Sequence, residues 1–77
     1  MDLILEDGPR IHLVEMKSGQ TLDGSWLEPL RSQREDLTDR PGITTLTATL
    51  LYGGDQAQMR QGVRVLPWHA IAKLGQD

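Results

Sequence analysis

The chain contains no cysteine and no phenylalanine, and only 4% of its 77 residues are aromatic. The absence of cysteine excludes disulfides and thiolate metal sites. Two histidines, His12 and His69, are too few for a typical zinc site unless carboxylates contribute, so we expect no metal and no cofactor. We treat residues 1–77 as one small domain. A hydrophobic core of this size usually needs added stabilisation from disulfides, a metal or oligomerisation, and oligomerisation is the one of these that remains.

Long hydrophobic runs and a strong positive charge are also missing. The net charge is −3, which disfavours non-specific binding to nucleic acid. Residues 56–76 contain three basic residues and no acidic one, so this part is either locally basic or an ordinary scatter of surface charge. No apolar run is long enough to span a membrane, and the first residues lack the basic region of a signal peptide. We therefore expect a cytoplasmic protein with no membrane partner.

Turn signals divide the chain into pieces of strand length, as in all-β proteins. The expected strands are residues 11–17, 21–27, 43–52, 62–66 and 68–74. The alternating threonines at 45, 47 and 49 favour a strand most clearly. Residues 3–5 either pair with 11–14 or form a short N-terminal helix, and within the polar connection 28–42 the stretch 29–37 has room for a helical turn. The sequence thus predicts an all-β fold: a strongly bent, antiparallel five-stranded sheet closed into a small barrel.

Two segments carry a resemblance to a known family. Residues 14–24 contain a strand, a Lys-Ser-Gly turn and a second strand with Gly24 at a characteristic spacing, and residues 63–71 contain a sharp Pro-Trp-His-Ala-Ile turn. Together they resemble the Sm-like family of small β-barrels, of the Lsm and Hfq type. The resemblance implies a barrel, assembly into rings and RNA binding. Residues 31–40 lack the methionine and asparagine of the family's RNA-binding stretch, and Trp68 stands where Hfq-type proteins have lysine.

No catalytic motif is present, so we expect no enzyme. The sequence lacks Gly-x-Ser-x-Gly, a phosphate-binding glycine-rich loop and His-Glu-x-x-His. The Gly53-Gly54 pair predicts a hairpin turn. The adjacent carboxylates Glu35 and Asp36 have no neighbouring base in the sequence to support acid–base chemistry.

The candidate RNA-binding residues are the following: Arg64, Trp68, His69, Arg34 and Arg40. An indole can stack on a base, an imidazole can bond a base edge, and an arginine can bind phosphate. Alternatively, Trp68 packs in a subunit interface, His69 caps a turn, and the loop arginines form solvated salt bridges. His12 is expected to be a half-buried strand residue, and Trp26 to pack in the core or an interface.

We expect a homo-oligomer, in the form of a closed ring. The fourth and fifth expected strands carry little protection against edge-to-edge pairing, and pairing the fourth strand of one copy with the fifth of the next closes a ring. The candidate interface residues are Val63, Val65, Leu66, Trp68, Ala70 and Ile71. Two functions remain open: an Sm-like ring protein with an RNA-binding or RNA-chaperone role, and an oligomeric scaffold or protein-interaction module that does not bind nucleic acid. The charge and the missing loop motif favour the second, whereas the Trp-His-Ala-Ile turn favours the first.

Overall fold

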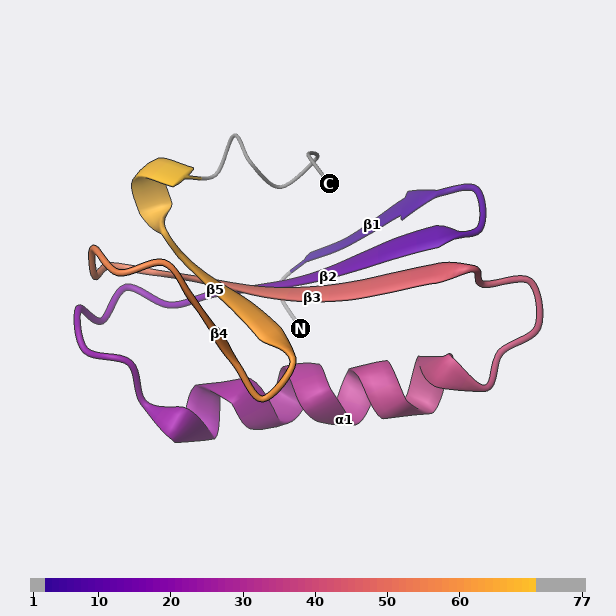
Figure 1. The fold of residues 1–77 in the computed structure, drawn as a ribbon, viewed down its shortest axis with the longest axis horizontal. Helices are drawn as coiled ribbons and strands as arrows, with labels where there is room; N and C mark the ends of the chain where they lie inside the picture. Colours follow the sequence, from indigo (N-terminus) through magenta and orange to yellow (C-terminus); the bar gives the residue numbers. More distant parts are fainter. Residues whose placement is uncertain (1–2, 71–77) are drawn as a thin grey trace.

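A computed structural model describes residues 3–70, which form one mixed five-stranded sheet with a helix against one face (Figure 1). The elements in chain order are β1 (Leu3–Asp7), β2 (Arg10–Met16), the 3₁₀ turn η1 (Gly24–Trp26), α1 (Leu27–Thr38), β3 (Thr45–Tyr52), β4 (Gln58–Arg60) and β5 (Val63–Pro67). The strand order across the sheet is β1-β2-β3-β5-β4. The sheet is open, so β1 and β4 form its two edges.

The first two strands form an antiparallel hairpin around Gly8-Pro9. Gly8 has a φ of +60°, a conformation that glycine adopts without steric cost. Proline then follows in the turn, where its missing N–H is not needed. The register places Leu3 opposite Val14 and Asp7 opposite Arg10. Of the two interpretations that the sequence left open for residues 3–5, strand pairing is therefore the correct one.

A helix replaces the second strand that the sequence predicted over residues 21–27. Asp23 caps η1: its carboxylate accepts bonds from the backbone N–H of Ser25 at 2.9 Å and from the Ser25 hydroxyl at 2.8 Å. These bonds lower the pKa of Asp23, the backbone bond most. The chain then continues directly into α1, where Pro29 lies in the first turn and costs no intrahelical bond. Asp23 and Ser25, which looked like part of the polar face of a strand, instead form the hydrogen bonds that cap η1.

The all-β antiparallel barrel that the sequence predicted is wrong. β2 and β3 are parallel, with Arg10 opposite Thr45 and Met16 opposite Leu51. β3 and β5 are also parallel, in register from Thr49 opposite Arg64 onward. Parallel neighbours need a long crossover rather than a hairpin, and α1 provides it between β2 and β3. α1 packs across one face of this open sheet.

The end of the described chain also differs from expectation. The hairpin turn lies at Gln61-Gly62, between β4 and β5, rather than at Gly53-Gly54, because β3 pairs with β5 and not with β4. Residues 68–70, the start of the expected last strand, form a 3₁₀ turn. Residues 71–74 of that strand lie outside the described residues.

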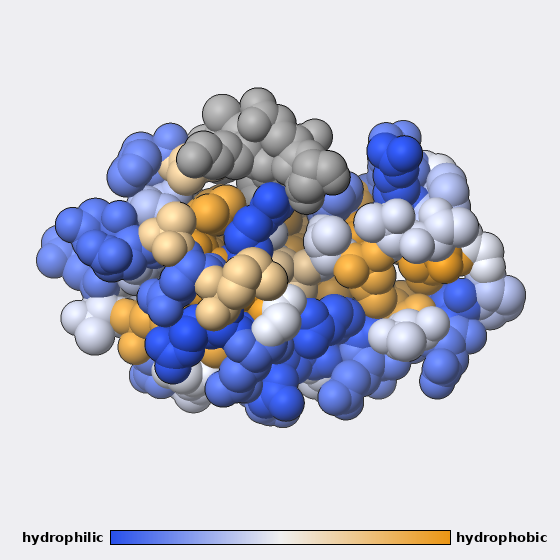
Figure 2. All heavy atoms as spheres, viewed as in Figure 1, coloured by the Kyte–Doolittle hydropathy of each residue, from blue (hydrophilic) through white to orange (hydrophobic). Residues whose placement is uncertain are grey.

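The core has a part on each face of the sheet. On the α1 face, the helix residues Leu27, Leu30 and Leu37 pack against buried side chains of β2, β3 and β5. In Figure 2, hydrophobic residues form a band between the helix and the sheet, and hydrophilic residues cover the outer side of the helix. The opposite face carries a smaller cluster: Val14, Leu51, Leu66 and Ala70, with Met16 against it. A single charged side chain, Glu15, is buried among the described residues and is 6% exposed.

The helices of the described part offer no membrane span. α1 has 12 residues, and none of the helices within residues 3–70 is long and apolar enough to cross a bilayer.

Candidate functional site

The residues expected to bind RNA lie in different parts of the molecule. Arg40 follows the C-terminal end of α1, ahead of the start of β3. Trp68 and His69 are exposed and follow β5, which runs parallel to β3, so they lie at the opposite end of the strands (Figure 1). Arg34 lies on α1 and Arg64 on β5. The described chain therefore does not gather the five residues into one surface.

Most of the residues expected at a subunit interface pack within the chain itself. Val63 and Val65 are fully buried against the α1 face, and Leu66 and Ala70 belong to the cluster on the other face. β5 has β3 on one side and, over Val63–Val65, β4 on the other, so this part of β5 has no free edge for the strand pairing that was expected to form a ring. Trp68 is 41% exposed, and Ile71 lies outside the described residues.

Two further residues behave as the sequence suggested. His12 is half-buried on the face of the sheet opposite α1, where its Nδ1 lies 2.6 Å from the Thr47 hydroxyl. Trp26 is half-buried against the helix-side core. Its ring also lies against Gly19, where a Cβ atom would approach Cη2 to 2.6 Å. Both residues therefore have structural roles within the described chain.

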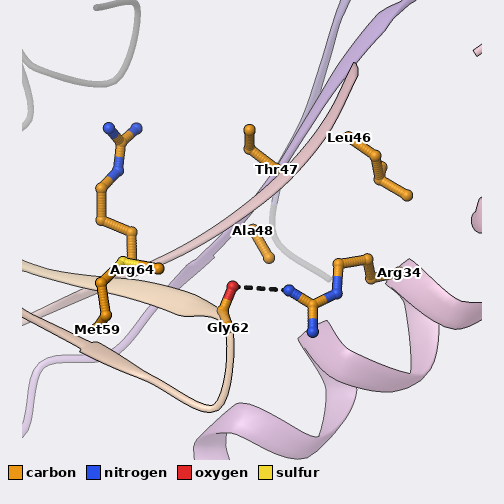
Figure 3. Close-up of a pocket in the computed structure, with 7 residues that line it drawn as sticks. All are labelled: Arg34, Leu46, Thr47, Ala48, Met59, Gly62 and Arg64. Atoms are coloured by element: carbon orange, nitrogen blue, oxygen red, sulfur yellow. Dashed lines mark hydrogen bonds between the residues drawn. The ribbon is translucent and has the colours of Figure 1, made fainter. Parts of the chain in front are cut away.

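Of the salt bridges expected among the arginines of residues 28–42, one involving Arg31 is present, while Arg34 makes a different contact. Arg31 pairs with Glu28 along the helix at 3.5 Å. Arg34 instead reaches the β4–β5 turn: its Nη1 donates to the Gly62 carbonyl oxygen at 2.6 Å (Figure 3). Its Nη2 donates to the Gln61 carbonyl oxygen at 3.4 Å. Arg34 thereby ties the helix to the hairpin.

A notch opens where β3 and β5 separate. β5 is in register with β3 from Thr49 onward, so the first half of β3 extends past the hairpin. The notch has a volume of about 290 Å³, and its lining residues are Arg34, Leu46, Thr47, Ala48, Met59, Gly62 and Arg64 (Figure 3). A second hollow, of about 220 Å³, shares Arg34 and Leu46 with the notch and continues toward Thr38 and Thr44. Together they form a groove along the outer side of β3.

The charge of the notch is positive, although the whole chain has a net charge of −3. Its described lining includes two arginines and no carboxylate. Arg34 enters from the helix, while Arg64 leaves β5 on the other side of the sheet and donates from Nε to the Thr49 hydroxyl at 3.4 Å. Figure 3 shows the two side chains on either side of the opening. An anionic group in the notch is therefore favoured by both arginines.

The second exposed feature is the outer edge of β1. All five residues of β1 are exposed, and Leu3, Ile4 and Leu5 are 38%, 44% and 38% exposed. This edge carries no lysine or proline, which natural proteins use to blunt exposed edges. The sequence alone showed an apolar segment here but did not show that it would be an edge, because that depends on strand order.

The notch was also missed from the sequence. The sequence identified Arg34 and Arg64 as candidate binding residues. Leu46 and Met59 lie far apart along the chain, so no local pattern showed that they line one notch with the arginines. Within residues 3–70, no three side chains of the His, Cys, Asp or Glu type come together as a metal site. No protein-family model, no curated protein and no solved structure shows a significant match to the chain.

Proposed function

We propose that this protein is a non-catalytic, cytoplasmic protein-interaction module that self-associates through the outer edge of β1. The supporting observation is an exposed edge strand with three consecutive large apolar residues, Leu3, Ile4 and Leu5. Such an edge is a template for pairing with another strand. A second copy of the chain is the occupant that this edge fits.

The backbone groups available on this edge follow from the hairpin. A two-residue turn makes Asp7 and Arg10 the hydrogen-bonded pair that closes it. Hydrogen-bonded and non-hydrogen-bonded pairs then alternate along the strands. The N–H and C=O groups of Leu3 and Leu5 therefore point to β2, whereas those of Ile4 point outward.

Two β1 strands can pair with twofold symmetry. An antiparallel register with Ile4 opposite Ile4 of the other copy brings Leu3 opposite Leu5. Leu3 and Leu5 share one face of the strand and Ile4 lies on the other, so every cross-strand pair among these residues is apolar. Such pairs each contribute roughly 0.2–1 kcal/mol beyond alanine pairs. The two sheets become continuous, and the apolar side chains of each β1 gain apolar neighbours on the other copy.

This assembly differs from the ring expected from the sequence. A ring needs two different complementary surfaces, whereas pairing of β1 with itself uses one surface twice and stops at a dimer. The dispersal of Arg40, Trp68 and His69 over the molecule supports the protein-interaction function over RNA binding. RNA binding stays a prediction, and it is included in the test.

Self-association is measured by light scattering after size-exclusion chromatography over a range of micromolar concentrations. We expect a mass of twice 8.6 kDa at the higher concentrations. The substitution Ile4→Lys should leave a folded monomer, because it places a charge in the middle of the paired edge. The matched control is Met59→Lys on β4, the opposite edge, where the side chain is 65% exposed; it should remain dimeric.

Two kinds of result would contradict the proposal, one on self-association and one on RNA binding. The first is a monomer at every concentration, or a dimer that Ile4→Lys leaves intact. The second is binding of short U-rich or A-rich RNA at low salt, where phosphate contacts are strongest, because it would restore the nucleic-acid function.

A further inference from the structure

We propose that the groove along the first half of β3 binds an extended, acidic peptide segment of a partner protein as an added strand. This inference goes beyond self-association through β1, because it concerns a different edge and a different partner. It depends on the geometry of β3, on the charge of the notch and on the shape of the groove.

The first half of β3 has a strand partner on one side. Residues Thr45–Ala48 pair with β2, while the register with β5 begins at Thr49. The backbone N–H of Lys17 donates to the carbonyl oxygen of Leu51 at 2.8 Å, which shows that the polar groups of Leu51 point to β2. Since successive residues of a strand point their polar groups to opposite sides, those of Leu46 point away from β2 and into the groove.

The groove has the shape of an extended peptide. The notch and the adjoining hollow share Arg34 and Leu46 and follow β3 from Ala48 back to Thr44. Five strand residues span about 17 Å, so four to six peptide residues fit beside them. α1 lies under this part of the sheet, and Met59 projects from β4 at the hairpin end. A strand placed here would bond to the backbone of β3, which is the mode of β-strand addition.

The charge of the notch selects an acidic partner. Arg34 uses two of its N–H groups on the carbonyls of the β4–β5 turn, and a guanidinium has five. Arg64 contributes a second positive charge on the opposite side of the opening. A carboxylate at the hairpin end of the added strand would lie near the Arg34 guanidinium and within the positive potential of Arg64, whereas a lysine there would be repelled.

The test uses two acetylated and amidated synthetic peptides with the same alternating valine and threonine centre. One has two aspartates at each end, and its control has two lysines at each end. Binding is followed by amide chemical shifts of the full chain during titration. We expect the acidic peptide to shift the amides of Leu46 and its neighbours in β3, and to bind at least fivefold more tightly than the lysine peptide. High salt should reduce this difference.

Two variants of one exposed residue distinguish an effect of charge on peptide binding from an effect of the substitution on folding. Met59→Glu places a carboxylate at the rim and should weaken binding of the acidic peptide about fivefold or more, while Met59→Lys should preserve or tighten it. Met59 is 65% exposed, so neither substitution disturbs the core. Arg31→Ala, on the same helix as Arg34 but outside the notch lining, is the control for a general loss of positive charge and should bind as the unmodified chain does.

Several outcomes would overturn the inference. They are no shift with the acidic peptide, equal binding of both peptides, equal effects of the two Met59 variants, and shifts confined to β1. A short single-stranded RNA that shifts the amides of β3 when the acidic peptide does not would assign the groove to phosphate instead. Ile4→Lys should leave peptide binding intact, so failure of this inference and failure of the β1 dimer are distinguishable.

Discussion

Gly62 combines two constraints in one residue of the β4–β5 turn. Its φ is +82°, and a Cβ atom there would lie 2.8 Å from Nη1 of Arg34. A side chain is therefore strained by the backbone and displaces the guanidinium that ties α1 to the hairpin. We expect Gly62→Ala to lower the free energy of unfolding by about 1–2 kcal/mol, measured by urea denaturation.

Gly24 provides the matched control for this substitution. No atom lies within 4 Å of its Cβ position, and its φ is not in the left-handed region. Gly24→Ala should leave stability unchanged or raise it by up to about 1 kcal/mol, because alanine reduces the freedom of the unfolded chain. Equal losses in the two variants would contradict the role given to the turn and to Arg34.

At the scale of elements, α1 is stabilised mainly by the packing of its buried leucines against the sheet rather than by the intrinsic helix propensity of its residues. Leu30 is fully buried against β3 and its neighbours, and a leucine-to-alanine change in a core costs about 2–5 kcal/mol. We expect Leu30→Ala to remove most of the stability of so small a domain. Ser32→Ala, at an exposed position of the same helix, should change stability by less than about 0.5 kcal/mol. Thermal unfolding followed by circular dichroism measures both, and a similar loss in the two would contradict this packing.

The elements show what the sequence can and cannot predict. The alternating threonines of residues 45–49 correctly predicted β3. The expected strands 11–17 and 62–66 correspond to β2 and β5. The sequence suggested only a helical turn within residues 29–37 and not the full α1, because its apolar positions are few: Leu27, Leu30 and Leu37 share one face. Pro29 and the charged residues between them resemble a polar loop. The cap at Asp23 was the available signal for a helix start nearby.

At the scale of the whole molecule, the sheet should have uneven stability across its width. β3 lies between two strands and is mostly buried, whereas β4 is a three-residue edge strand whose residues are all exposed. In native-state hydrogen exchange, we expect the amides of β3 that bond to β2 to exchange through global unfolding, and those of β4 to exchange much faster. Equal protection of β3 and β4 would contradict the strand order.

Topology is where the sequence-based prediction failed most. Local sequence patterns located strands, but they did not show whether strands far apart in the chain pair in a parallel or an antiparallel direction. The parallel pairing of β2 with β3 depends on α1 packing across the sheet, so missing the helix led directly to the antiparallel barrel. The candidate site failed for the same reason: the notch brings Arg34, Leu46 and Met59 together through this topology, and no local spacing connects them.

The parallel pairing of β2 with β3 also has a consequence for the speed of folding. His12 and Thr47, which lie side by side in the sheet, are separated by 35 positions along the chain. The β1–β2 hairpin and α1 can form from neighbouring residues in microseconds, but the central pair requires a loop of this length to close before its contacts contribute. Closure entropy grows only slowly with loop length, by about 0.6 kcal/mol per doubling. Lengthening the link between α1 and β3 should therefore slow folding slightly. Weakening the packing of α1 against the sheet should slow folding strongly, because the packed helix holds β3 close to β2.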